Sequence, residues 1–277
     1  MKIRKGLIIT VLVIVSVVMC LSFTACGKKT LKGFDIDLAK AVFDDLGIKV
    51  EFVKISWDAK ETELSSKNID LIWNGLTINS ERQEIFSIGL PYMSNKQVLV
   101  VKTANASQYT SANDLAGKIV AVESGSAGDE YIQDLKDNGA TTINKQGLST
   151  QALALMEVKN GTSDCAVIDS VMAGYYTSTG DFKGQLSIVD LGLDIEEYGI
   201  AARKADTGVT DKINVTLNKL YKNGKVAEIA KTYGLENEIL DMGTYTSTGE
   251  TAGWDYIQQR GKIIIGYTLF APIAYEE

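Results

Sequence analysis

Short apolar stretches alternate along this chain with stretches of helical apolar spacing, and this alternation constrains the fold more than any other feature. Apolar side chains recur at helical intervals over residues 37–46, where Asp35 is placed to cap the helix and Gly47 to end it. Such alternation is typical of an α/β protein. Further strands are expected at residues 50–54, 69–73, 98–101, 119–122 and 164–168, and further helices at residues 58–66, 128–137, 151–159, 211–222 and 226–233.

Two pairs of strand-like segments resemble one another. Residues 117–122 (GKIVAV) match residues 261–266 (GKIIIG), and residues 68–73 (NIDLIW) match residues 163–168 (SDCAVI). The pairs predict two lobes built on one plan. Their order differs, however, because one GK segment precedes its partner and the other follows its partner near the C-terminal end.

Joining the last residue to Leu31 would restore one order in both lobes. The break would then fall in a surface turn between Tyr275 and Gly33, where circular permutation is tolerated. Residues 242–253, rich in Thr, Ser and Gly, would be the linker that joins the former ends. We therefore expect a circularly permuted chain in which the strand at 262–275 belongs to the first lobe.

The N-terminal segment has the composition of a secretory leader. Basic residues in the first five positions precede an apolar run at residues 7–19, which is short for a membrane span. Small residues then precede Cys26, as in a lipoprotein signal. We expect a signal peptide at residues 1–26, lipidation of Cys26 and a polar tether at residues 27–30; an ordinary signal peptide with an incidental cysteine is the alternative.

Composition excludes several classes of function. The chain has no histidine, so Ser-His-Asp and Cys-His catalysis are excluded. The three cysteines, Cys20, Cys26 and Cys165, form neither a disulfide framework nor a zinc pattern. A formal net charge of −7 argues against a nucleic-acid partner. No metal and no cofactor are expected.

Chemically useful residues follow several of the expected strands. Ligands of open α/β sheets bind beyond the carboxyl ends of the strands, so these residues are the candidates for a binding site. They offer a cation, two anions, hydroxyl groups, glycines and aromatic rings. The candidates are Trp57, Asn74, Gly75, Thr77, Arg82, Glu123, Ser126, Asp169, Tyr267 and Phe270.

This set of groups suits a zwitterion. A guanidinium pairs with a carboxylate in a two-pronged geometry, and a carboxylate pairs with an ammonium group. The loop at Ser126 precedes a helix, whose free N–H groups favour an anion. Taken singly, each residue has a plainer interpretation: Arg82 as a surface ion-pair partner, Asp169 as a helix cap, Glu123 as a solvated loop charge, and Trp57 and Phe270 as core.

At these residues the chain resembles the amino acid-binding proteins of ABC transporters, the family of the glutamine-, histidine- and cystine-binding proteins. The matching segments are residues 33–39 (GFDIDLA), 74–78 (NGLTI) with Glu81 and Arg82, Pro91 with Tyr92, 122–126 (VESGS) and 198–201 (YGIA). In permuted order they span nearly all of the mature chain.

The resemblance implies a type II periplasmic-binding-protein fold, with two lobes that each hold a mixed sheet flanked by helices. The first lobe would comprise residues 31–98 and 202–277, and the second lobe residues 103–197. Two hinge strands would cross between the lobes near residues 99–102 and 198–201.

The resemblance also implies roles for the candidates. Arg82 would clamp the α-carboxylate of an amino acid, and Asp169 would hold its α-ammonium group. The supporting contacts would come from Thr77 and the backbone around Ser126 for the carboxylate, from the carbonyl of Gly75 for the ammonium group, and from Trp57 and Phe270 on either side of the ligand side chain.

Two positions depart from the family pattern. Many members carry an aspartate where this chain has Tyr267 and Thr268, and many carry lysine or glutamine where it has Glu123. Both positions face the ligand side chain in the family, so the identity of the amino acid does not carry over.

The expected function is capture of an amino acid outside the cytoplasm by a monomer anchored to the membrane through Cys26, followed by delivery to an ABC transporter permease. Three alternatives remain. One is an enzyme of the same fold, a dehydratase or a peptidoglycan lyase, with Glu123 as its acid or base. The others are a sensory amino acid-binding module and a permuted chain whose C-terminal strand, within residues 243–277, fails to dock.

Overall fold

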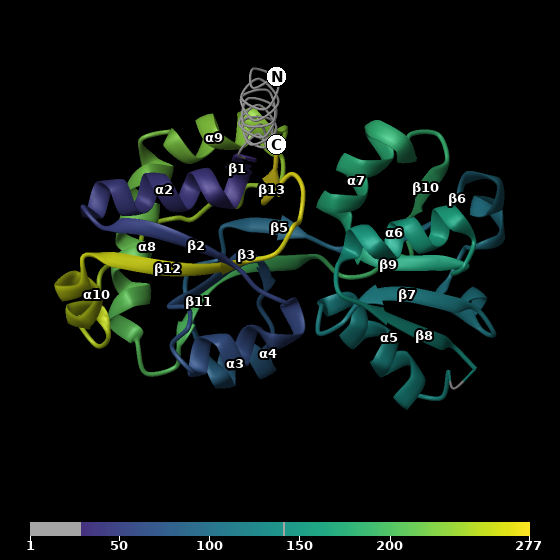
Figure 1. Cartoon of the computed structure of the whole chain (residues 1–277), viewed down its shortest axis with the longest axis horizontal. Coiled ribbons are helices and arrows are strands. Elements are labelled where there is room, and N and C mark those ends of the chain that lie inside the picture. Colours follow the sequence, from purple (N-terminus) through teal and green to yellow (C-terminus); the bar gives the residue numbers. More distant parts are fainter. Residues whose placement is uncertain (1–28, 141) are drawn as a thin grey trace, which may run out of the picture. The chain divides into compact units, whose positions relative to one another are not determined.

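Two separate mixed β-sheets organise the part of the chain that the structure, a computed structural model, describes: residues 29–140 and 142–277 (Figure 1). Each sheet carries helices on both faces, and the two-lobed α/β fold expected from the sequence is confirmed. The expected signal peptide and Cys26 lie outside the described residues.

The first sheet has the strand order β2-β12-β3-β11-β4, and β5 pairs with the far part of β11. β12 runs parallel to both of its neighbours, whereas β11 is antiparallel to β3, β4 and β5. The strands are β2 (Lys49–Lys54), β3 (Leu71–Thr77), β4 (Phe86–Ile88), β5 (Met93–Asn95), β11 (Glu196–Arg203) and β12 (Lys262–Tyr267).

Alternating side chains of β3 enter two different apolar clusters. Leu71 and Trp73 pack in the cluster that includes α2 (Phe34–Leu46), α8 (Thr207–Lys222) and α9 (Lys225–Tyr233). Ile72 and Leu76 pack in a second cluster with Leu64 of α3 (Lys60–Ser65). This alternation follows from the two-residue period of a strand. It places α2, α8 and α9 on the face of the sheet opposite α3 and α4 (Ser80–Ile85) (Figure 1).

Helix α2 begins earlier than the sequence predicts. Its N-cap is Gly33, whose φ of 135° suits glycine, and its C-cap is Gly47 in the left-handed conformation, as predicted. The prediction that Asp35 caps the helix is wrong. Asp35 lies inside the first turn and is buried, where it accepts hydrogen bonds from the backbone of Gly75 and from the hydroxyl of Tyr92.

The second sheet has the strand order β10-β6-β9-β7-β8. Successive residues of β6 face opposite sides: Val98 and Val100 belong to one apolar cluster, Leu99 and Val101 to another. The strands are β6 (Gln97–Lys102), β7 (Ile119–Glu123), β8 (Asn144–Leu148), β9 (Cys165–Asp169) and β10 (Leu186–Val189), and the helices are α5 (Ala127–Asp137), α6 (Gln151–Asn160) and α7 (Ser170–Ser178).

The chain passes between the two sheets at positions other than those expected. Residues 99–102 lie inside β6 of the second sheet, and residues 198–201 lie inside β11 of the first. The passages fall instead at Lys96, between β5 and β6, and at residues 190–195, between β10 and β11. The apolar runs mark buried strand interiors, whereas the residues of the passages are exposed or half-buried.

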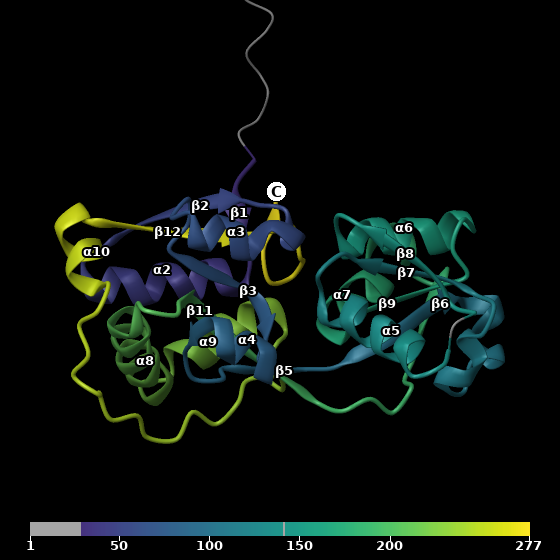
Figure 2. The ribbon, with the colours of Figure 1, turned by 90° about the horizontal axis from the view of Figure 1, so that it is seen from below.

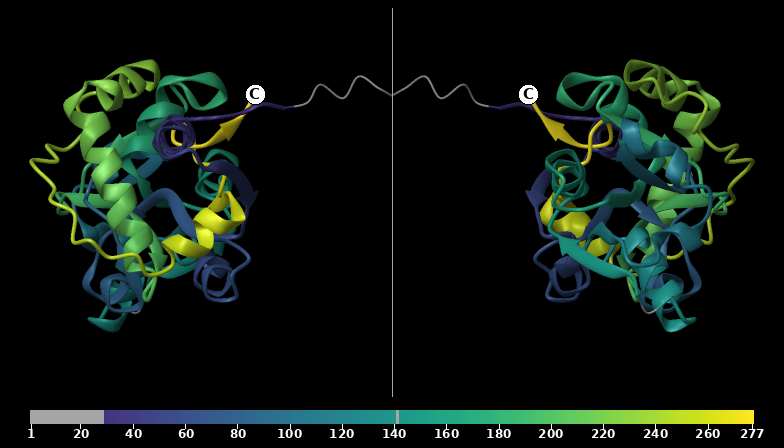
Figure 3. Two further views of the ribbon diagram at one scale, coloured as in Figure 1. Left: turned by 90° about the vertical axis from the view of Figure 1, so that its left-hand side faces the viewer. Right: turned by 90° about the vertical axis from the view of Figure 1, so that its right-hand side faces the viewer.

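The C-terminal segment supplies a central strand of the first sheet. β12 pairs with β2 over its whole length and with β3 at Ile265 and Gly266. The alternative in which this strand fails to dock is therefore contradicted. Farther along the chain, β13 (Tyr275–Glu276) pairs with β1 (Leu31–Lys32). The first and last strands of the described chain therefore lie side by side (Figure 3).

The linker before β12 follows the surface of α8 (Figure 2). Asp211 of α8 accepts hydrogen bonds from the hydroxyl groups of Tyr245, Ser247 and Thr248, and Asn218 donates to the carbonyl oxygen of Gly243. These bonds hold the linker against α8. The linker is followed by α10 (Trp254–Arg260), which immediately precedes β12.

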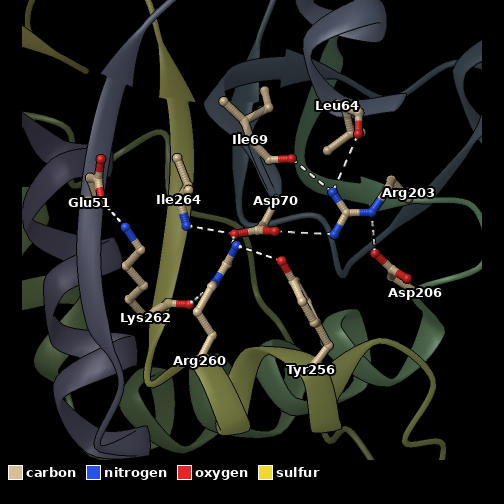
Figure 4. A network of polar contacts seen from close by, with 10 residues as sticks. All are labelled: Glu51, Leu64, Ile69, Asp70, Arg203, Asp206, Tyr256, Arg260, Lys262 and Ile264. Carbon is tan, nitrogen blue, oxygen red and sulfur yellow. Dashed lines mark hydrogen bonds and ion pairs between the residues drawn. The ribbon is translucent and has the colours of Figure 1, made fainter. Parts of the chain in front are cut away.

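A buried carboxylate joins α10, β12, β3 and β11 (Figure 4). Asp70, just before β3, is 1% exposed and forms ion pairs with Arg203 and Arg260. Its second oxygen also accepts a hydrogen bond of 2.8 Å from the backbone nitrogen of Ile264 in β12. Arg203 further donates to the carbonyl oxygen of Ile69 at 2.8 Å. The network fixes the C-terminal strand to the strand beside it.

The helices of the described residues are short. None of them is both long and apolar enough to cross a lipid bilayer. Single 3-10 turns complete the fold at η1 (Trp57–Ala59), η2 (Thr103–Gln108), η3 (Ala112–Leu115) and η4 (Gly180–Phe182).

Candidate functional site

A narrow cavity lies where the strand ends of the two sheets meet. Its volume is about 10 Å³, about the space of one water molecule, so the two lobes lie close together around it. The first lobe lines it with Trp57, Asn74, Gly75, Thr77, Arg82, Thr268 and Phe270, and the second lobe with Glu123, Ser126, Ala127, Gln151 and Asp169. The structure thus brings every candidate residue except Tyr267 to one cavity.

Arg82 is held by the first turn of α4. The side chain of Asn79 caps this helix by accepting a hydrogen bond of 2.8 Å from the backbone nitrogen of Arg82. One terminal nitrogen of the guanidinium donates to the carbonyl oxygen of Thr77 at 2.8 Å, and the other pairs with Glu130 of α5 at 2.5 Å. Arg82 is 4% exposed, so it is both an ion-pair partner and a buried cation at the cavity.

Asp169 ends β9 and is held by three side-chain amides. One carboxylate oxygen accepts from Asn95 at 2.6 Å and from Gln97 at 2.8 Å, and the other accepts from Gln151. Burial raises the pKa of Asp169, and these hydrogen bonds oppose the shift. Asp169 is the N-cap residue of α7, but its side chain makes no capping bond to that helix.

Glu123 ends β7, the strand beside β9, and is a second acid at the cavity. It is 5% exposed rather than a solvated loop charge. Burial raises its pKa to about 8; the neighbouring charge of Asp169 adds to the shift, and Gln151 and Lys60 oppose it.

Gly75 and the aromatic rings shape the wall on the first lobe. Gly75 has φ +63°, and a side chain there would begin 2.7 Å from Phe270 and 3.0 Å from Tyr198. Phe270 packs edge-on against Tyr198. Trp57 is buried, and the ammonium group of Lys60 lies 5.1 Å from its ring centre.

Two hydroxyl groups expected at the site already have partners. The Ser126 hydroxyl accepts a hydrogen bond of 3.1 Å from Asp129 as the N-cap of α5. The Thr77 hydroxyl donates to Glu196 at 3.0 Å. Each hydroxyl can still offer the cavity a lone pair, whereas its bond to the protein fixes its direction.

Tyr267 is the one candidate that the structure places elsewhere. It is buried against Phe52, and the next residue, Thr268, lines the cavity in its place, because successive side chains of a strand point in opposite directions. Ala127 and Gln151 also line the cavity and were not among the candidates. Both begin helices just after strands β7 and β8, which is the signal that could have identified them.

Contacts between the lobes border the cavity. Lys60 of α3 donates to the carbonyl oxygen of Gly125 at 2.9 Å, and Asn79 donates to Glu130 at 3.1 Å beside the Arg82 pair. Lys60 and Glu130 are further residues that the strand-end rule did not find. Residues from both lobes therefore help to close the cavity.

The arrangement separates charge across a small enclosed space. A guanidinium on the first lobe and a hydrogen-bonded carboxylate on the second can hold opposite ends of one zwitterion. Within the described residues, no group of three or more Cys, Asp or Glu side chains is arranged to hold a metal ion. Fold and cavity together define a two-lobed solute-binding protein.

The comparisons with known proteins give the family. Residues 18–236 match the family profile of the bacterial extracellular solute-binding proteins, family 3, and the chain belongs to this family. The arginine-binding extracellular protein ArtP of Bacillus subtilis is 31% identical over 203 residues, which are 73% of this chain and 77% of that protein.

Solved structures agree with this assignment. A substrate-binding protein of an ABC uptake transporter from Streptococcus pneumoniae, with bound histidine, is 36% identical with a TM-score of 0.69; the match covers 77% of this chain and 85% of that one. An ancestral amino acid-binding protein described as a precursor of cyclohexadienyl dehydratase is 32% identical with a TM-score of 0.65, covering 72% and 84%. These relatives are named as binding proteins rather than enzymes.

Proposed function

We propose that this protein captures one free α-amino acid outside the cytoplasm and delivers it to an ABC transporter permease. The observation that carries the proposal is that Arg82 and Asp169, on different lobes, line the same cavity. The relatives named above, which bind arginine or histidine, support a ligand with an α-carboxylate and an α-ammonium group.

In the proposed mechanism, the ligand bridges the two lobes. Its α-carboxylate pairs with Arg82, and its α-ammonium group pairs with Asp169 and the carbonyl oxygen of Gly75. Because these contacts exist only when the lobes are together, the ligand stabilises the closed form over an open form. The permease then recognises the closed form.

Titration calorimetry with the common amino acids tests the proposal. Arg82→Ala and Asp169→Asn should each weaken binding by roughly 2–5 kcal/mol, because each leaves one charged end of the ligand unpaired. Lys183→Ala and Asp134→Asn change exposed residues outside the cavity and serve as matched controls. Unaltered affinity in both site variants would refute the assignment.

We further propose that a lipid on Cys26 anchors the protein, with residues 27–30 as the tether. The family description, which names extracellular solute-binding proteins, supports a position outside the cytoplasm. A monomer is sufficient for this role, since one chain supplies both lobes of the cavity.

We also propose that the chain is circularly permuted relative to its family. Three features support this: the central position of β12, the pairing of β1 with β13, and the family match, which ends at residue 236, before α10 and β12. The linker along α8 would then join the former ends.

A further inference from the structure

The cavity holds more carboxylate than a simple zwitterion requires. The proposed ligand has one α-ammonium group, and Asp169 receives it. Glu123 lines the same cavity from the adjacent strand β7 and is buried to the same degree. A second acid therefore faces the ligand without an assigned partner.

Charges around the cavity do not balance this acid. Arg82 is engaged by Glu130, and Lys60 directs its ammonium group to the carbonyl oxygen of Gly125 and to the ring of Trp57. Glu123 forms no ion pair with any residue in the described part of the chain. A positive charge supplied by the ligand would give Glu123 an ion-pair partner.

Asn74 adds a second, independent observation. Its amide nitrogen donates to the hydroxyl of Thr268 at 3.0 Å, which fixes the orientation of the amide. Its amide oxygen is buried, accepts no hydrogen bond and belongs to a residue that lines the cavity. A buried acceptor without a donor costs about 1–3 kcal/mol, so the site favours a ligand that carries N–H groups.

We propose that Glu123 and the amide oxygen of Asn74 form a subsite for a cationic ligand side chain, so that the ligand is an α-amino acid with a guanidinium or ammonium group. This inference rests on the proposed function, because it assumes that Arg82 and Asp169 hold the α-carbon end. The rings of Trp57 and Phe270 then line the path of the intervening methylene groups.

Neutral analogues of the same shape separate charge from size. The affinities of the wild-type protein for L-arginine and L-lysine are compared by calorimetry with those for L-citrulline and L-2-aminoheptanoic acid, in which a methyl group replaces the ammonium group of lysine. At least one cationic ligand should bind tenfold or more tightly than its neutral analogue. Equal or tighter binding of both neutral analogues would overturn the inference, and this comparison needs no variant.

Glu123→Gln then tests the residue itself. It keeps the shape of the side chain and removes its charge, so the preference for the cationic ligand should fall at least tenfold, while the affinity for citrulline stays within threefold. Glu236→Gln, in an exposed loop, is the matched control and should change neither. An undiminished preference for the cationic ligand in Glu123→Gln would contradict the assignment to this residue.

Failure of the inference differs from failure of the proposed function. If no α-amino acid binds the wild-type protein, the proposed function fails and this inference fails with it. If neutral amino acids bind as well as cationic ones, the proposed function stands and only the cationic subsite is overturned. Agmatine, which is arginine without its carboxylate, should bind far more weakly than arginine if Arg82 clamps that group.

Discussion

The ionisation of Glu123 gives the cavity a testable pH dependence. Burial raises its pKa to about 8, and the charges that face it are those of Asp169, Lys60 and Asp58. A cationic ligand side chain favours the ionised carboxylate, so binding below pH 8 must release a proton. The affinity for the cationic ligand should rise by up to about tenfold per pH unit between pH 6 and pH 8 and then level off.

Calorimetry in buffers of different ionisation enthalpy would measure the released proton directly. Glu123→Gln should abolish most of the release. Proton uptake, or an affinity that falls as pH rises, would contradict the assignment. The same shift affects folding: because the folded-state pKa lies above the ordinary value of 4.5, Glu123 contributes stability below that value and loses it as pH rises towards about 8.

Gly75 is required both by its backbone conformation and by the space around it. In Gly75→Ala the new methyl group would meet the ring of Phe270, and the positive φ would become unfavourable. We expect ligand binding to weaken by about tenfold or more, or at least about 1.4 kcal/mol, because the ring of Phe270, which lines the cavity, must shift from its position.

Gly139→Ala provides the matched control for this prediction. Gly139 also has a positive φ, +109°, but nothing lies within 4 Å of the position of its Cβ. Gly139→Ala should therefore also place alanine at an unfavourable positive φ, but it should leave the ligand affinity unchanged. Calorimetry on both variants separates strain from obstruction, and equal affinities would show that Phe270 does not limit the cavity.

Individual residues also show what the sequence could and could not predict. The strand-end rule found Arg82 and Asp169, because it depends only on where apolar runs stop. The helix-cap prediction misjudged Asp35, because the partners of that carboxylate, Gly75 and Tyr92, are distant in the sequence and only the folded chain brings them together.

At the scale of elements, the Asp70 network is the contact that holds β12 in register with β3. Asp70→Asn would leave two partly buried guanidinium groups facing a neutral amide. Breaking a buried ion pair on one side typically costs 3–5 kcal/mol, so we expect a loss of about that size in the free energy of unfolding. Denaturant titration followed by circular dichroism measures it.

An exposed ion pair supplies the comparison. Asp45 pairs with Lys219 between α2 and α8, and both side chains are partly exposed, at 29% and 60%. Asp45→Asn should cost less than about 1 kcal/mol, because solvent screens such pairs. Similar losses in the two variants would show that burial does not set the strength of the Asp70 network.

Element positions were predictable where burial is strong and unpredictable where the chain is exposed between the sheets. The buried run at 98–101 correctly indicated β6, and the run at 164–168 indicated β9. The passages between the sheets could not be found in this way. Lys96 is a single residue between two strands. Residues 190–195 alternate apolar and polar residues as a strand would, but they are exposed or half-buried and form no strand, so the sequence pattern does not reveal either passage.

For the whole molecule, the position of β12 makes the C-terminal segment indispensable to the first lobe. A chain truncated after residue 242 would lack α10 and β12, leaving β2 and β3 without the strand between them. We expect it to lose ligand binding and the cooperative unfolding of the first lobe. Thermal melts and calorimetry test this, and a truncated chain that binds as well as the full chain would contradict it.

The central position of β12 also has a consequence for biogenesis. If the chain emerges from a secretion channel N-terminus first, residues 97–189 of the second lobe are available long before residues 262–267. The second sheet can then assemble before the first is complete, because β2 and β3 lack the strand β12 that pairs with both of them. Export would expose unpaired strand edges until the final segment arrives, which makes this period the one in which a periplasmic or surface chaperone would matter most.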